Sequence, residues 1–127
     1  MARKGPIQAP VPEAGPPMAL VLVRQGTGER CPVPTPEALV GRADAGEGIF
    51  PEPDLTRFEA DVVSVSRRHA RIRKQADGTF AIIDLKSSNG TQVGETVLSP
   101  ATWHPLRVGD VVTFGRLAFD VGADHAG

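Results

Sequence analysis

The chain has 127 residues, a formal net charge of −1 and 40% hydrophobic residues, which suits one compact domain with a tail. The near-zero net charge gives no general attraction to nucleic acid or to an anionic membrane, so we expect neither as a partner. The single cysteine, Cys31, can form no internal disulfide and has no partners at metal-ligand spacing. We therefore expect a reducing, cytoplasmic location and neither a metal nor another cofactor.

The N-terminal 17 residues contain five prolines and little that a core could bury. Proline lacks a backbone N–H and fixes φ, so we expect residues 1–17 to form an extended, disordered tail. The apolar run at residues 18–23 is too short for a signal-peptide core or a membrane span. A proline-rich tail could also dock onto another domain, although this one lacks a clear PxxP pattern with basic residues.

From residue 18 onward the chain consists of short β-rich runs separated by turn residues. Polar and apolar residues alternate at 71–73, as a half-buried strand requires, and an Ala-Asp-Gly turn at 76–78 precedes the next run. The expected strands are residues 18–24, 38–41, 71–73, 79–84, 91–93, 96–98, 110–114 and 117–121.

Many short strands, frequent glycine and no long amphipathic helix indicate an all-β fold, an antiparallel β-sandwich. We expect the domain to span residues 18–122, followed by a short C-terminal tail at 123–127. One connection, residues 43–62, is long for a small sandwich. Loops of that length usually carry function or are mobile, and the sequence leaves both interpretations open.

Three short motifs lie in order beside these expected strands. They are GR at residues 41–42, SRRH at residues 66–69 and SSNGT at residues 87–91. Each motif alone is common in β proteins. Together, in this order and at these spacings, they resemble the forkhead-associated (FHA) domain, over roughly residues 18 to 121.

The resemblance implies a sandwich whose functional loops lie at one end and which binds phosphothreonine in extended peptides, as a signalling adaptor. It implies that four residues hold the phosphate: Arg42, Ser66, Arg67 and Ser88. Asn89 would hold the peptide main chain. The implied partner is a threonine-phosphorylated protein or peptide, such as a serine/threonine kinase or its substrate.

These residue types suit that role chemically. A phosphate ester near pH 7 carries close to two negative charges and three acceptor oxygens. Arg42 offers a planar fork of charged N–H groups, and Ser66 and Ser88 offer hydroxyl donors. Arg67 can add charge at the rim or contact the phosphate itself. Asn89 carries both a donor and an acceptor, so it can pair with a peptide backbone.

Four other motif residues are interpreted as structural support. The ring of His69 is expected to brace the loops that carry the GR and SRRH motifs, as the resemblance implies. Gly41 is expected to let two backbones approach closely, and Gly90 to supply a positive φ. Thr91 is expected to stabilise its own loop.

Residues 66–74 contain five arginines and lysines, which raises the question of a nucleic-acid site. Such a site would need interleaved aromatic residues or a recognition helix, and this stretch has neither. Arg71 and Arg73 fall on one face of the expected strand, with Ala70 and Ile72 on the other. The stripe is therefore interpreted as the solvated outer face of a sheet.

Two other functions compete with phosphopeptide binding. The sequence contains no P-loop, no GxSxG nucleophile elbow and no HExxH motif, so we do not expect an enzyme. The second alternative is a phosphate-independent protein-assembly module on the same fold, in which the phosphate pocket is present but unused.

Overall fold

The computed structural model describes residues 18–58 and 62–124. The predicted N-terminal tail, residues 1–17, lies outside these ranges, as do residues 125–127 of the predicted C-terminal tail. The last strand continues to Asp124, so regular structure extends past residue 122, and the domain limits themselves stay a prediction.

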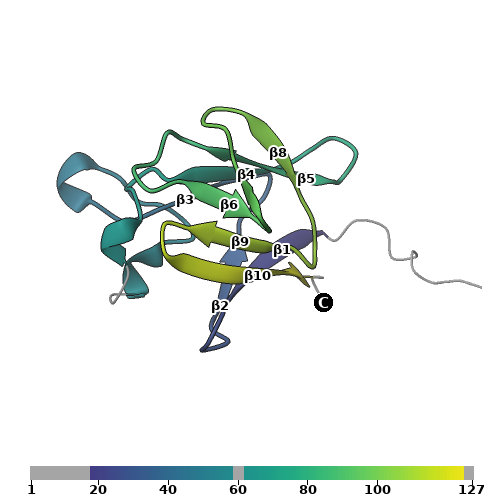
Figure 1. Ribbon diagram of the computed structural model, residues 1–127, viewed down its shortest axis with the longest axis horizontal. Coiled ribbons are helices and arrows are strands. Elements are labelled where there is room, and N and C mark those ends of the chain that lie inside the picture. The colour runs from purple at the N-terminus through teal and green to yellow at the C-terminus, as the bar shows by residue number, and fades with distance from the viewer. Residues whose placement is uncertain (1–17, 59–61, 125–127) are drawn as a thin grey trace, which may run out of the picture.

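The described residues form ten strands in two antiparallel sheets that pack face to face (Figure 1). The strands are β1 (Ala19–Arg24), β2 (Arg30–Val33), β3 (Glu37–Val40), β4 (Ala70–Lys74), β5 (Phe80–Asp84), β6 (Thr91–Val93), β7 (Thr96–Val97), β8 (Trp103–Leu106), β9 (Val111–Phe114) and β10 (Leu117–Asp124). One sheet has the order β2-β1-β10-β9-β6-β7 and the other has the order β3-β4-β5-β8. The predicted all-β antiparallel sandwich is confirmed.

The core lies between the two sheets and is built from alternate residues of their strands. In β1, Leu20 and Leu22 are fully buried, and in β10 the inward positions include Leu117 and Phe119. The ring of Phe119 packs edge-on against the ring of Phe58, with centroids 5.5 Å apart. Burying each large apolar side chain contributes about 1.5–3 kcal/mol, so these alternating faces hold the sheets together.

Two strands, β2 and β8, are not predicted by the sequence pattern. Each contains a proline, Pro32 in β2 and Pro105 in β8. Both strands lie at sheet edges, where the missing N–H of proline can face away from the neighbouring strand. The eight predicted strands are all present, with bounds that shift by at most three residues.

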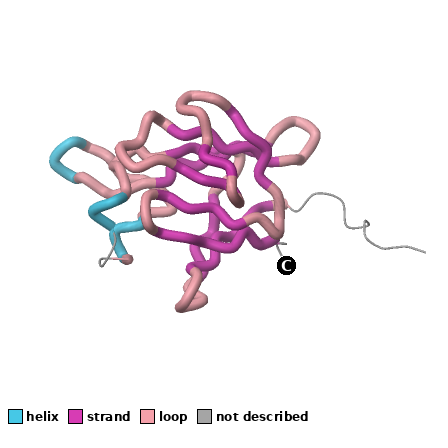
Figure 2. Tube along the Cα trace, viewed as in Figure 1, coloured by secondary structure: helices cyan, strands magenta, loops and turns pink. Residues whose placement is uncertain are grey.

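The long connection between β3 and β4 is attached to the core along its described part. It contains the 3-10 turns η2 (Ala45–Glu47), η3 (Leu55–Arg57) and η4 (Val62–Ser64), which lie at one end of the sandwich (Figure 2). The side chains of Ile49, Leu55 and Phe58 are buried and fasten the connection to the core. None of these turns, the only helices among the described residues, is long enough to cross a membrane.

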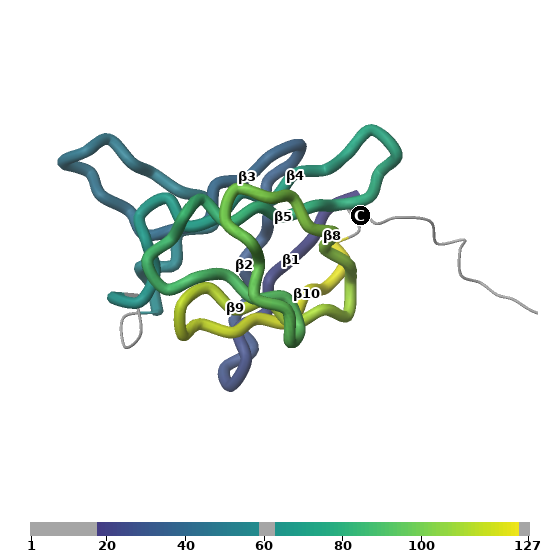
Figure 3. The backbone as a smooth tube through the Cα atoms, turned by 45° about the horizontal axis from the view of Figure 1, so that its top comes forward, coloured from purple at the N-terminus to yellow at the C-terminus, as the bar shows by residue number. Residues whose placement is uncertain are grey.

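Strand register brings the three motifs to the same end of the sandwich. Val40 pairs with Ala70, and Ala70 pairs with Asp84. The residues after β3, before β4 and after β5 therefore meet, and these segments contain the GR, SRRH and SSNGT motifs. Figure 3 shows the 3-10 turns at this end and the β4–β5 hairpin at the opposite end.

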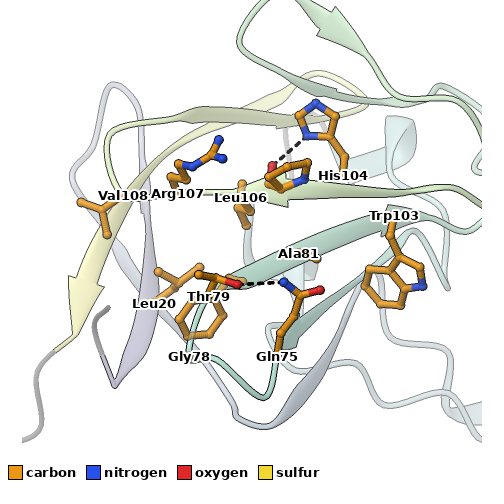
Figure 4. A pocket seen from close by; sticks show the side chains of 12 residues that line it. Leu20, Gln75, Gly78, Thr79, Ala81, Trp103, His104, Leu106, Arg107 and Val108 are labelled. Carbon is orange, nitrogen blue, oxygen red and sulfur yellow. Dashed lines mark hydrogen bonds between the residues drawn. The ribbon is translucent and has the colours of Figure 1, made fainter. Parts of the chain in front are cut away.

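A cavity of about 440 Å³ opens beside β5 and β8, near the β4–β5 hairpin (Figure 4). Trp103 and Leu106 contribute to its mainly apolar lining, and the Gln75 amide donates to the Thr79 hydroxyl at 2.8 Å. No residue of the three motifs lines this cavity. It is therefore separate from the motif end.

Candidate functional site

Gly41 lets the GR and SRRH segments lie against each other. A Cβ at this position would overlap the carbonyl oxygen of Arg67. The N–H of Arg42 donates to that same oxygen at 3.2 Å, and Arg42 Nε donates to Val65 O at 3.0 Å. The two terminal nitrogens of Arg42 have no hydrogen-bond partner among residues 18–58 and 62–124. The half-buried guanidinium is thus held at one nitrogen and can donate from the others.

Two predicted phosphate ligands, Ser66 and Ser88, are joined directly. The N–H of Ser88 donates to Ser66 Oγ at 2.9 Å. Because this oxygen acts as the acceptor, the Ser66 hydroxyl can still donate its own hydrogen. Ser88 is exposed, and its hydroxyl makes no hydrogen bond within the described part of the chain. The two hydroxyls therefore lie on adjoining loops with donors to offer.

His69 lies fully buried beneath the motif loops, with its ring edge-on to Phe114 at 5.7 Å between centroids. Its Nδ1 accepts from the Ser66 N–H at 2.9 Å, so Nε2 carries the hydrogen and donates to Gly90 O at 2.9 Å. Burial lowers the pKa of His69, which favours this neutral ring. The ring joins the SRRH and SSNGT loops. The GR strand is reached by backbone instead, from the His69 N–H to Val40 O.

Asp84 holds the SSNGT loop from below. Its buried carboxylate accepts from the N–H and hydroxyl of Ser87 and from the Thr91 hydroxyl. Burial alone would raise the pKa of Asp84, but these hydrogen bonds outweigh burial and hold the pKa below its ordinary value. Gly90 has φ of +87°, and its N–H donates to Ser87 Oγ at 2.9 Å. Sequence reasoning did not single out Asp84; its only signal is its place at the strand end before SSNGT.

Asn89 is exposed and is oriented by one hydrogen bond. Its Nδ2 donates to Ser64 O at 2.9 Å. The Ser64 hydroxyl accepts from the Arg116 N–H at 2.8 Å, which ties the segment around Ser64 to the β9–β10 turn. The carboxamide oxygen of Asn89 accepts no hydrogen bond from the described residues, so it can accept one from a ligand.

Arg67 forms an ion pair with the long β3–β4 connection. Its Nη1 donates to Asp44 Oδ2 at 2.8 Å, and the two side chains are 46% and 31% exposed. The hydrogen bond from Arg67 holds the pKa of Asp44 below its ordinary value. The motifs did not identify Asp44, because an aspartate before a glycine-containing stretch also suits a turn.

Arg71 and Arg73 lie along the outer face of the four-stranded sheet, as the alternation predicted. Arg71 Nη1 is 3.9 Å from a carboxylate oxygen of Glu37, and the guanidinium of Arg73 lies 4.0 Å from the centroid of the Trp103 ring. Ala70 is buried on the opposite face. Arg71 and Arg73 are therefore engaged on the sheet and contribute no hydrogen bond to the motif loops.

The FHA domain family model matches residues 39–115. The oxoglutarate dehydrogenase inhibitor of Corynebacterium diphtheriae is 41% identical over 86 residues, which cover 66% of this chain and 55% of that protein. The chain thus spans about half the length of this relative.

Solved FHA domains have the same fold. One comes from a structural and functional study of phosphothreonine-dependent FHA domain interactions; it is 27% identical, with a TM-score of 0.59, and the match covers 85% of this chain and 99% of that one. The FHA domain of FhaA, solved in complex with the intracellular domain of another protein, is also 27% identical with a TM-score of 0.59, and the match covers 81% of this chain and 99% of that one.

Proposed function

The chain belongs to the forkhead-associated domain family, and we propose that it is a phosphothreonine-dependent binding module that acts as a signalling adaptor. The observation that supports this most is the junction of the motif loops. The Arg42 backbone bonds to the SRRH loop, and Ser66 bonds to Ser88 of the SSNGT loop. One anion could therefore be reached from all three loops.

The available donors suit a phosphate dianion. The terminal nitrogens of Arg42 offer charged N–H groups, and the hydroxyls of Ser66 and Ser88 add two neutral donors. A phosphate ester has three oxygens and nearly two charges near pH 7, which is more than a single side chain can satisfy. Arg42 is held through Nε by Val65 O, and the Ser66 hydroxyl oxygen is held by the Ser88 N–H, so two of these three donors are positioned before a ligand binds.

Arg67 and Asn89 complete the proposed site. We assign Arg67 to the phosphate, and Asn89 to the peptide main chain through its carboxamide oxygen. Four motif residues are assigned to structural support and are not proposed to contact the ligand: Gly41, His69, Gly90 and Thr91.

The partner in this proposal is a threonine-phosphorylated protein. The corynebacterial relative is named an inhibitor of an enzyme, and the FhaA domain was solved in complex with part of another protein. They support a regulatory binding role for this chain. We propose a serine/threonine kinase or its substrate as the partner, in the cytoplasm, where the free and buried Cys31 would stay reduced.

The decisive variant is Arg42→Ala, with Arg107→Ala as its matched control. Arg107 is exposed and lines the cavity at the opposite end. Truncating a charged partner of a buried ionic contact typically costs about 2–5 kcal/mol. Binding of a phosphothreonine peptide should therefore fall at least about tenfold in Arg42→Ala and stay unchanged in Arg107→Ala. Fluorescence anisotropy measures the affinity, and thermal unfolding checks the fold.

The unphosphorylated twin peptide separates this proposal from the assembly alternative. A phosphate-dependent module binds only the phosphorylated twin, whereas an assembly module binds both or neither. Unchanged affinity in a folded Arg42→Ala protein would refute the site assignment.

Affinity for the phosphothreonine peptide should also fall as the pH drops below about 6, where the phosphate loses its second charge. A flat profile between pH 5 and 7.5 would count against recognition of a dianion.

A further inference from the structure

One proposed phosphate ligand is already paired with an acid. Arg67 donates through Nη1 alone to Asp44 Oδ2 at 2.8 Å, and the other guanidinium nitrogens have no hydrogen-bond partner among the described residues. Asp44 follows Arg42 by two residues and thus lies at the rim of the same loops. The Asp44 carboxylate therefore competes with the ligand phosphate for the Arg67 guanidinium.

The position of Asp44 is fixed more firmly than that of Arg67. Its N–H donates to Ile49 O and its carbonyl accepts from the Ile49 N–H, both at 2.9 Å. The Ile49 side chain is buried, so this small loop is attached to the core. The other carboxylate oxygen, Oδ1, accepts from the Glu47 N–H at 3.3 Å and caps η2. When the two part, the long side chain of Arg67 is the one that moves.

We propose that Asp44 is a built-in competitor of the ligand phosphate: its carboxylate holds Arg67 in the free protein and lowers the affinity for phosphothreonine peptides. This inference rests on the proposed function. If Arg67 turns fully to the phosphate, the ion pair must break. If it keeps Asp44 and binds the phosphate through another nitrogen, the carboxylate and the phosphate lie near the same guanidinium and repel each other. In both cases the acid opposes the ligand.

The pair is weak enough to be exchanged. It has a single hydrogen bond rather than the two of a guanidinium–carboxylate fork, and both side chains are partly exposed. Exposed ion pairs of this kind contribute little because water and salt screen them. A phosphate dianion carries more charge than a carboxylate and can therefore displace it. Asp44 thus sets the affinity of the site without blocking it.

Asp44→Asn tests the inference and leaves the turn intact. Asparagine keeps the oxygen that caps η2 but removes the charge. Glu47→Gln is the matched control, since Glu47 lies on the same turn and has no ion-pair partner among the described residues. The probe is a fluorescein-labelled peptide with a fixed central phosphothreonine and degenerate flanks, measured beside its threonine twin. Both variants are also made in an Arg67→Ala background.

We expect Asp44→Asn to bind the phosphorylated probe roughly two- to fivefold more tightly than wild type, the range that exposed ion pairs contribute. Glu47→Gln should change affinity less. In the Arg67→Ala background, Asp44→Asn should gain no more than Glu47→Gln. A loss of affinity in Asp44→Asn, or a gain that persists without Arg67, overturns the inference while the proposed function stands. Equal binding of the phosphorylated probe and its threonine twin by the wild-type protein would overturn both the inference and the proposed function.

Discussion

Replacing His69 with alanine should destabilise the domain strongly. The ring is fully buried, and its two nitrogens bond the SRRH and SSNGT loops. Truncating a buried aromatic side chain to alanine costs about 3–5 kcal/mol through lost contacts and a cavity. Gly90 O keeps a second partner, the Gly115 N–H at 3.1 Å, but the Ser66 N–H loses its acceptor. An orphaned donor adds about 1–3 kcal/mol, toward the lower end here because Ser66 is partly exposed.

The expected total, at least about 3 kcal/mol, is a large share of the 5–15 kcal/mol of a typical domain. Urea unfolding measures it, with the fluorescence of Trp103, the single tryptophan, as the signal. His104→Ala is the matched control, because His104 is only partly buried and its Nδ1 contacts the carbonyl of the adjacent Pro105. A His69→Ala protein within about 1 kcal/mol of wild type, a cost usual for exposed positions, would refute the bracing role.

Three further predictions concern the same support. Gly41→Ala should destabilise the domain by more than about 2 kcal/mol in urea unfolding, because the added Cβ would overlap Arg67 O. Gly46→Ala is the control and should cost little, because the nearest atom to a Cβ there is 3.5 Å away. Equal effects of the two substitutions would contradict the close approach at Gly41. Thr91→Val removes a hydrogen bond to the Asp84 carboxylate and should cost about 1.5–3 kcal/mol; a neutral effect would show that this bond is dispensable. Burial lowers the pKa of His69, so between its folded and unfolded pKa values the unfolded chain binds more protons than the folded one. The free energy of unfolding should therefore fall as the pH drops below about 6.5 and on through the folded pKa. Urea midpoints that stay level from pH 7.5 to 5 would contradict this.

The sequence predicted the sandwich because its apolar runs are short, are separated by turn residues and include no long amphipathic helix, and because residues 71–73 alternate polar and apolar residues with period two. In β4, Ala70 and Ile72 are buried while Arg71 and Arg73 face outward. β2 and β8 were missed because a proline lies inside each run, although the residues of β2 alternate between exposed and buried. Whether a proline ends a strand or lies at a sheet edge depends on which strands pair, and local sequence does not contain that information.

The candidate site was predicted unevenly for a similar reason. The motif residues could be grouped only through the resemblance to a known family, since spacing alone does not specify the Val40–Ala70–Asp84 register. Asp84 was missed because nothing in its position at a strand end shows that its carboxylate accepts hydrogen bonds from Ser87 and Thr91 of the following loop. Asp44 was missed because tertiary structure supplies its partner. Asp44 meets Arg67 across 23 positions of sequence, and nothing local distinguishes it from an ordinary turn aspartate.

At the motif end, buried residues support the loops and outward-facing residues offer groups to a ligand, so the two kinds of residue should respond differently to mutation. His69 and Asp84 satisfy polar groups of the motif loops from inside the domain, while Arg42, Ser88 and Asn89 turn donors or acceptors outward. Loss of a buried support should lower stability and binding together, because the loops lose their positions. Loss of an outward-facing group should lower binding far more than stability, because Arg42 and Asn89 each give up one hydrogen bond to a backbone carbonyl. A plot of binding loss against stability loss for these variants should therefore separate into two groups, whereas a single correlated line would mean that the exposed residues also act as supports.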